Sequence, residues 1–117
     1  MTMQDTPKLT GQVALITGGG RGIGKAIALR FAQEGAALVL CGRTVAALEE
    51  VCHAAHQMGS AAVPVQADVS SEADVERVRD TALHVFGQID ILVNNAGVAG
   101  PLGLITTISK QAWDDTL

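Results

Sequence analysis

The stretch VALITGGGRGIG, residues 13–24, decides the fold of this chain. Four apolar residues, Val13 to Ile16, precede a glycine-rich turn, and a helical pattern begins near Gly22. A strand, a glycine turn and a helix start are typical of phosphate-binding sites. The bare backbone lets a phosphate approach, and the helix start offers unpaired N–H groups and a positive dipole end. The stretch therefore predicts a pyrophosphate site.

The composition of the 117-residue chain indicates one globular domain, with 48% hydrophobic and 17% charged residues. The net charge of −4 and the scattered placement of only eight basic residues argue against a nucleic-acid partner. The two cysteines show neither a disulfide framework nor metal-ligand spacing, and Cys41 is expected to be a small buried residue. We expect no metal site.

The sequence shows no membrane or secretion pattern. Its first residues lack a basic region followed by an apolar stretch, and no apolar run approaches the roughly 20 residues that cross a bilayer. We therefore expect a soluble, cytoplasmic protein with no membrane partner.

Short apolar runs alternate with longer helical patterns along the chain. Glycines at positions 35, 59 and 87 are natural helix stops, and Ser71 is expected to cap the third helix with Asp74 three residues on. On the first helix, Ile23, Ile27 and Phe31 recur every four residues. The strands are expected near residues 12–17, 37–41, 61–66 and 89–94, and the helices near 22–34, 44–58 and 71–87, with a further helix starting at Ser109.

This order predicts an α/β fold, a Rossmann-type doubly wound parallel sheet in three α/β/α layers that is incomplete in this chain. The expected strand order is 3-2-1-4, with the ligand crevice between the first and fourth strands. Pro64 places the third strand at a sheet edge. We interpret residues 1–10 as an N-terminal extension and residues 11–117 as a partial NAD(P)-binding domain.

Three motifs in register make the chain similar to the short-chain dehydrogenase/reductase family, over about residues 8–117. They are the spacing Gly18-xxx-Gly22-x-Gly24 preceded by Thr17, Asp68-Val69 after the third strand, and Asn94-Asn95-Ala96-Gly97 after the fourth. A glycine turn alone would equally suit a tight strand-to-helix connection. The combination is much more specific.

The resemblance implies a role for each matching residue. The glycine turn would wrap the pyrophosphate, the carboxylate of Asp68 would accept from the adenine amino group, and residues 95–97 would line the crevice beside the nicotinamide ribose. Asn94 is expected to tie strands together instead, and a helix-capping role for Asp68 stays open. The implied cofactor-binding residues are Gly18, Gly20, Arg21, Gly22, Ile23, Gly24, Arg43, Asp68, Val69, Asn95, Ala96 and Gly97.

Charge at the end of the second strand favours NADP(H) over NAD(H). NAD sites carry a carboxylate there for the ribose 2′-hydroxyl, whereas this chain has none between Gly42 and Glu49. Arg43 and Arg21 could instead flank a 2′-phosphate. The alternative is that Arg43 is simply solvated at a helix start.

Members of the family use a catalytic tyrosine, a lysine four residues later, a serine and an asparagine, and this sequence contains no tyrosine. We find no catalytic residue, and we expect His53, His56 and His84 to lie on solvated helix faces. The pair His53 and His56 could hold a metal, but no third ligand is evident. The chain is thus interpreted as the first part of a longer enzyme that is inactive alone. The isolated product is expected to be poorly soluble or partly disordered, because its fourth strand would expose an edge.

The resemblance implies hydride transfer between nicotinamide and a carbonyl or alcohol, as in 3-oxoacyl thioester reductases or alcohol dehydrogenases. Complete relatives are expected to be homo-oligomeric. One alternative is a non-catalytic NADP(H)-binding module or an inactive truncated relative. Another, an extended-type nucleotide-sugar epimerase or dehydratase, is disfavoured because Arg21 stands where its turn would need glycine.

Overall fold

The computed structural model describes residues 6–95, in which strands and helices alternate as the sequence predicts. Their bounds agree with the expected ones to within one or two residues. The elements are β1 (Val13–Thr17), α1 (Gly22–Gln33), β2 (Ala37–Gly42), α2 (Val45–Gln57), β3 (Ala62–Gln66), α3 (Glu72–Phe86) and β4 (Ile91–Val93).

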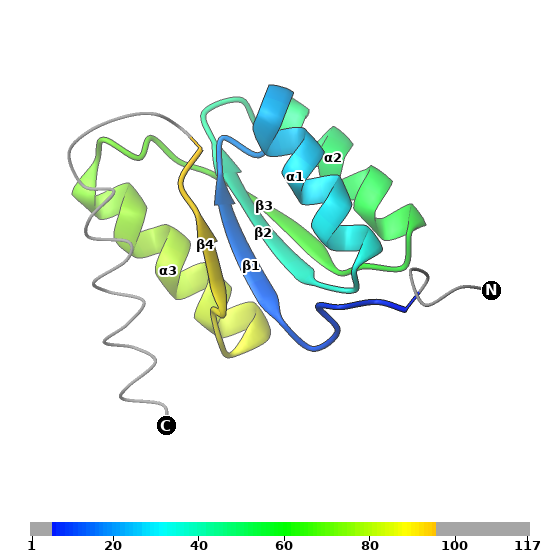
Figure 1. Ribbon diagram of the computed structural model, residues 1–117. Coiled ribbons are helices and arrows are strands. Elements are labelled where there is room, and N and C mark those ends of the chain that lie inside the picture. The colour runs from blue at the N-terminus through cyan, green and yellow to red at the C-terminus, as the bar shows by residue number, and fades with distance from the viewer. Residues whose placement is uncertain (1–5, 96–117) are drawn as a thin grey trace.

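The four strands form one parallel sheet in the order β3-β2-β1-β4, which confirms the predicted topology (Figure 1). Val13 pairs with Ala37 and Thr17 with Cys41, so β1 and β2 run in register. Pro64 lies on β3, at an edge of the described sheet, as predicted. Because all strands are parallel, their carboxyl ends meet at one side of the sheet.

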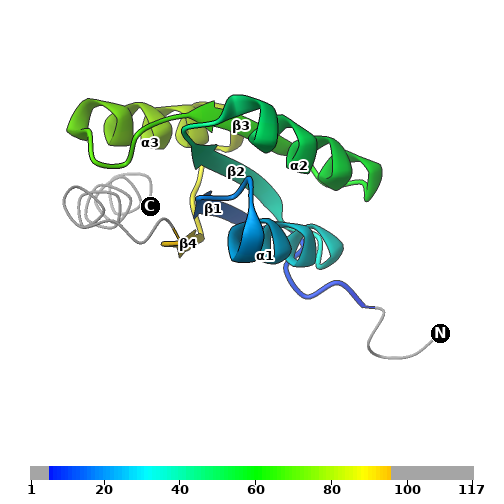
Figure 2. The ribbon, with the colours of Figure 1, turned by 90° about the horizontal axis from the view of Figure 1, so that it is seen from above.

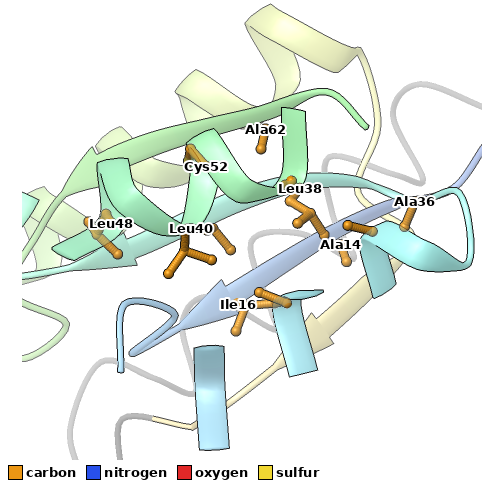
Figure 3. Close-up of a cluster of buried hydrophobic side chains, with 12 residues drawn as sticks. Ala14, Ile16, Ala36, Leu38, Leu40, Leu48, Cys52 and Ala62 are labelled. Atoms are coloured by element: carbon orange, nitrogen blue, oxygen red, sulfur yellow. The ribbon is translucent and has the colours of Figure 1, made fainter. Parts of the chain in front are cut away.

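Helices cover both faces of the sheet and complete the three layers (Figure 2). Side chains of α1 and α2 pack on one face, where Leu48 and Cys52 of α2 lie close to Leu40 of β2 (Figure 3). Val75, Val78 and Ala82 of α3 pack on the other face. Burial raises the pKa of Cys41 to about 12, so this thiol is an inert core residue.

The inward face of α1 differs from the expected one. The recurring Ile23, Ile27 and Phe31 predict the helix correctly, but its buried residues are Gly24, Ala28 and Ala32. Ile27 and Phe31 are only half-buried, and Ile23 is 72% exposed. The small residues let the helix approach the sheet closely, and the larger side chains flank the contact.

The other two helices each bury one apolar stripe. Leu48, Val51, Cys52 and Ala55 are buried on α2. On α3, Val75, Val78 and Ala82 are buried, Phe86 packs on the core and Val85 is exposed.

The helix signals act as predicted. The Ser71 hydroxyl accepts a hydrogen bond from the Asp74 N–H at 3.3 Å, and Gly87, with φ +76°, ends α3. Gly35 and Gly59 follow α1 and α2 with φ values of +90° and +87°.

Strand β4 is shorter than the expected residues 89–94. The Asp90 N–H donates to the Val13 carbonyl at 2.8 Å, but the Val13 N–H donates to the Asp90 carboxylate at 2.7 Å. A side chain thus takes the place of a backbone ladder partner, and regular pairing begins only at Ile91. Within residues 6–95, no helix has both the length and the apolarity to cross a membrane.

Candidate functional site

The glycine turn connects the buried end of β1 to the first turn of α1. Gly18 and Gly22 have φ values of +65° and +53°, in the left-handed region where a side chain is strained. Gly24 is needed for space, because an added Cβ would collide with the Gly18 carbonyl and lie 2.6 Å from the Asn95 amide nitrogen. Arg21 precedes α1 without a side-chain cap bond, so the first-turn N–H groups are left for a ligand.

The junction of β1 with β4 is closed by partly buried hydrogen bonds. The Thr17 hydroxyl, fully buried, donates to the Val93 carbonyl at 3.3 Å and accepts from the Asn95 N–H at 2.9 Å. The Asn95 side-chain amide donates to the Gly18 carbonyl at 3.2 Å. Asn95 therefore ties β1 to β4, a role that the sequence predicts for Asn94, and the Asn94 side chain is exposed.

Two adjoining pockets extend from the glycine turn across the carboxyl ends of β2 and β3, and we call them together the groove. The first, about 160 Å³, lies between the turn and the start of α2; the second, about 300 Å³, lies against the loop after β3. Gly18, Gly42 and Arg43 line both pockets. The remaining lining residues are Gly20, Arg21, Thr44, Ala47, Leu48, Ala67, Asp68, Val69 and Ser70.

Asp68 is exposed at the groove and held by Ser70. Its Oδ1 atom accepts from the Ser70 hydroxyl at 2.6 Å and from the Ser70 N–H at 2.9 Å. These two bonds lower the pKa of the Asp68 carboxyl, the hydroxyl bond more than the backbone bond. The nearby Arg43 charge lowers it by a smaller amount. The cap of α3 is Ser71, so the helix-capping alternative for Asp68 is wrong.

The cations at the groove have no ion-pair partner in the part of the chain that the structure describes. The three ion pairs there join Arg30 to Glu34, Arg77 to Asp74 and Arg79 to Asp80. Arg21 and Arg43 are both exposed. The groove thus offers two exposed guanidinium groups beside a glycine turn, a combination suited to phosphate.

The histidines lie on exposed helix faces, with one contact that the sequence did not predict. His56 Nε2 lies 2.8 Å from the Ala62 carbonyl and so bridges α2 to β3. His53 lies 3.3 Å from the Gln57 side chain. Among residues 6–95, no three His, Cys, Asp or Glu side chains gather as metal ligands would.

The structure brings most of the predicted site residues together. Gly18, Gly20, Arg21, Arg43, Asp68 and Val69 line the groove. Gly22 and Lys25 line a further pocket beside the glycine turn. Gly24 lies against Gly18 and Asn95 and lines neither pocket of the groove, and the Ile23 side chain is exposed. Ala96 and Gly97 lie outside the described residues.

Two residues of the site are not predicted from the sequence. Thr17 is expected only to precede the turn, although its hydroxyl joins β1 to the end of β4. Ala47 approaches the turn so closely that a Cβ on Gly20 would lie 3.0 Å from its methyl group. A small residue one turn into the second helix was the available signal.

A glycine turn at the end of a central parallel strand, beside the point where the strand order reverses, defines a Rossmann-type nucleotide-binding fold. The family comparison gives the particular class: the short chain dehydrogenase family matches residues 12–117. The chain belongs to this family.

Relatives and solved structures extend the likeness. A short chain dehydrogenase/reductase of Aspergillus aculeatus is 44% identical over 110 residues, which are 91% of this chain and 42% of the relative. The 3-ketoacyl-(acyl-carrier-protein) reductase of Brucella melitensis, solved with NADH, is 49% identical with a TM-score of 0.71, over 78% of this chain and 36% of that one.

The L-sorbose reductase of Gluconobacter frateurii, solved with NADPH and L-sorbose, is 41% identical with a TM-score of 0.74. It is matched over 80% of this chain and 36% of its own. The chain therefore spans about two fifths of the length of the proteins it matches, and these proteins include binders of both nicotinamide cofactors.

Proposed function

We propose that this chain supplies the cofactor-binding part of an NADP(H)-dependent short-chain oxidoreductase acting on a small carbonyl or alcohol substrate. The pyrophosphate would lie on the glycine turn, against the N–H groups at the start of α1. Nicotinamide bound there would exchange a hydride with the substrate carbon. We place the protein in the cytoplasm, and we expect a homo-oligomer, as the family resemblance implies.

The preference for NADP(H) is supported by one observation, the exposed Arg43 that directly follows β2 and has no ion pair within residues 6–95. Gly42 ends that strand, no carboxylate follows it directly, and the Arg43 side chain lines both pockets of the groove. A charge-assisted bond to a 2′-phosphate would contribute roughly 1.5–3 kcal/mol, or about ten- to a hundredfold in affinity. Arg21 would contribute from the other side of the first pocket.

On the adenine side, Asp68 and Val69 would form the rest of the site. The Asp68 carboxylate would accept from the adenine amino group through Oδ2, because Oδ1 is occupied by Ser70. Val69, buried on the core, would offer its backbone. Asn95, Ala96 and Gly97 would border the nicotinamide half.

We also propose that a protein of this sequence alone does not turn over carbonyl substrates. The family reaction needs a tyrosine as acid and base, and no tyrosine occurs among the 117 residues. Incubation with NADPH and carbonyl substrates, followed by absorbance at the nicotinamide band, should show no oxidation. Measurable reduction by a pure, correctly sized sample would contradict this.

The cofactor assignment is tested by replacing Arg43 with alanine and titrating NADPH and NADH. We expect Arg43→Ala to weaken NADPH binding about tenfold or more while leaving NADH binding within about twofold. The matched control is Arg30→Ala, which removes an exposed arginine of α1 that pairs with Glu34 instead. An unchanged affinity ratio in Arg43→Ala would contradict the preference for NADP(H).

A non-catalytic NADP(H)-binding module is the second candidate, and the missing tyrosine favours it equally. The two candidate functions predict different results for the isolated chain, in its melting temperature with NADPH and in its turnover. A module built to bind should show a sharp rise in melting temperature with NADPH, whereas a part of an enzyme should gain turnover once a polypeptide with the serine, tyrosine and lysine is joined to it.

A further inference from the structure

The residues that follow β3 are fastened to α3 by a chain of polar contacts that the cofactor argument does not use. Asp74 lies near the start of α3, and its Oδ2 atom accepts a hydrogen bond from the Asp68 N–H at 2.8 Å. Its Oδ1 atom lies 3.5 Å from the Arg77 guanidinium, one helical turn on. The carboxylate thus joins the groove to its own helix.

Arg77 continues the chain of contacts toward β2. Its guanidinium donates to the Gln66 carbonyl at the end of β3. The Gln66 side-chain amide in turn donates to the Arg43 carbonyl at 3.2 Å. Asp74 and Arg77 of α3 therefore hold the backbone on both sides of the second pocket, Asp74 at Asp68 and Arg77, through Gln66, at Arg43.

The contacts made by Asp74, Arg77 and Gln66 act on backbone atoms of the neighbouring residues, so they do not occupy the proposed ligand-binding groups. Asp68 is held through its N–H and Oδ1, and Arg43 through its carbonyl, while the Arg43 guanidinium has no ion-pair partner within residues 6–95. Residues whose backbone is already held in place are preorganised for binding, because less conformational entropy is lost when a ligand binds.

We infer that Asp74 and Arg77 are positioning residues for the adenosine half of the groove, and that they determine how well the site recognises the adenine amino group. The inference rests on the proposed function and adds residues to it. Asp74 and Arg77 touch no ligand; they act through Asp68 and Arg43. Their side chains are 32% and 51% exposed, so the pair itself contributes little to folding.

The test uses two cofactors that differ only at the adenine ring, NADPH and its hypoxanthine analogue, which lacks the amino group. The full chain should bind NADPH about tenfold more tightly than the analogue. Asp74→Ala should reduce this ratio to about twofold or less, and Arg77→Ala should reduce it partially. Glu76→Ala, which removes an exposed carboxylate of α3, is the matched control and should keep the ratio.

A second measurement needs no ligand. Hydrogen exchange of the Asp68 amide should be at least tenfold faster in Asp74→Ala than in the unmodified chain, with α3 otherwise protected. Asp74→Asn, which keeps the size of the side chain, serves if the alanine variant does not fold. A folded Asp74 variant with an unchanged affinity ratio and unchanged exchange would overturn the inference. If the unmodified folded chain binds neither nucleotide, the proposed function itself is wrong.

Discussion

The junction of β1 with β4 and the carboxyl ends of β2 and β3 lie at the same side of the sheet, yet they hold their residues by different means. At the junction, Thr17 is fully buried and Gly24 has no room for a Cβ. At the other end, Arg43 and Asp68 are exposed, and they are held by hydrogen bonds to Gln66 of β3, to Ser70 and to Asp74 of α3.

This difference separates two kinds of contribution. Buried polar groups and close backbone contacts affect folding, because removing a partner leaves an unsatisfied group or a clash. Exposed charged side chains add little to the free energy of unfolding, and they remain accessible to a ligand. Substitutions at the junction should therefore change stability first, and substitutions at the β2–β3 end should change binding alone.

The largest effect is expected for Gly24→Ala. The new methyl group would meet the Gly18 carbonyl and the Asn95 amide, so the turn must shift, and we expect a loss of about 3 kcal/mol in the free energy of unfolding. Gly22→Ala is the comparison, because nothing lies within 4 Å of its Cβ position and only the φ of +53° is unfavourable. It should cost about 1 kcal/mol. Urea denaturation measures both, and equal losses would contradict the packing argument.

Thr17→Val should have the next largest effect. Valine keeps the shape but removes the hydroxyl that bonds to the Val93 carbonyl and the Asn95 N–H, so we expect a loss of about 1–3 kcal/mol. In the control Thr81→Val, the lost hydroxyl bonds to the Arg77 carbonyl on the exposed side of α3, and the change should stay within about 0.5 kcal/mol. A Thr17→Val protein as stable as the control would show that the junction is not held as described.

Much of this arrangement follows from local sequence, and some of it does not. The alternation of apolar runs and helical periods predicts the α/β order, and the topology of doubly wound Rossmann sheets then predicts the strand order. The pyrophosphate site is likewise predicted from the glycine spacing, and the cofactor preference from the missing carboxylate after Gly42, because both features are local in the chain.

The remaining features depend on contacts between distant residues. Asp90 shortens β4 only because Val13 lies opposite it, and Asp74 reaches Asp68 only once α3 has packed on the sheet. Likewise, the buried face of α1 is set by how closely it approaches β1, which the recurrence of Ile23, Ile27 and Phe31 does not reveal.

At the open end of the groove, Arg43→Ala should leave the free energy of unfolding within about 0.5 kcal/mol of the unmodified chain. Its guanidinium has no ion-pair partner in the described range 6–95, so little folding energy is lost. Thermal denaturation without cofactor measures this. A marked destabilisation would show that Arg43 is structural, and would remove the contrast between the two ends.

The smallest effect concerns the ionisation of Asp68. Because the Ser70 bonds lower its pKa in the folded chain, the stabilisation they provide is complete above the ordinary value of 3.8 and is lost as pH falls through the lowered value. Ser70→Ala should raise the pKa of Asp68 toward 3.8, as followed by carboxyl NMR titration. Ser71→Ala, which removes the α3 cap but keeps both Ser70 bonds, should not. No rise in Ser70→Ala would contradict the assigned cause.

The most direct test is a calorimetric titration of the folded 117-residue chain with NADPH and, separately, NADH. We expect saturable heat from both cofactors, because the glycine turn would hold the pyrophosphate they share, with NADPH bound about tenfold more tightly through Arg43. A well-folded sample that gives no heat with either cofactor would contradict the account.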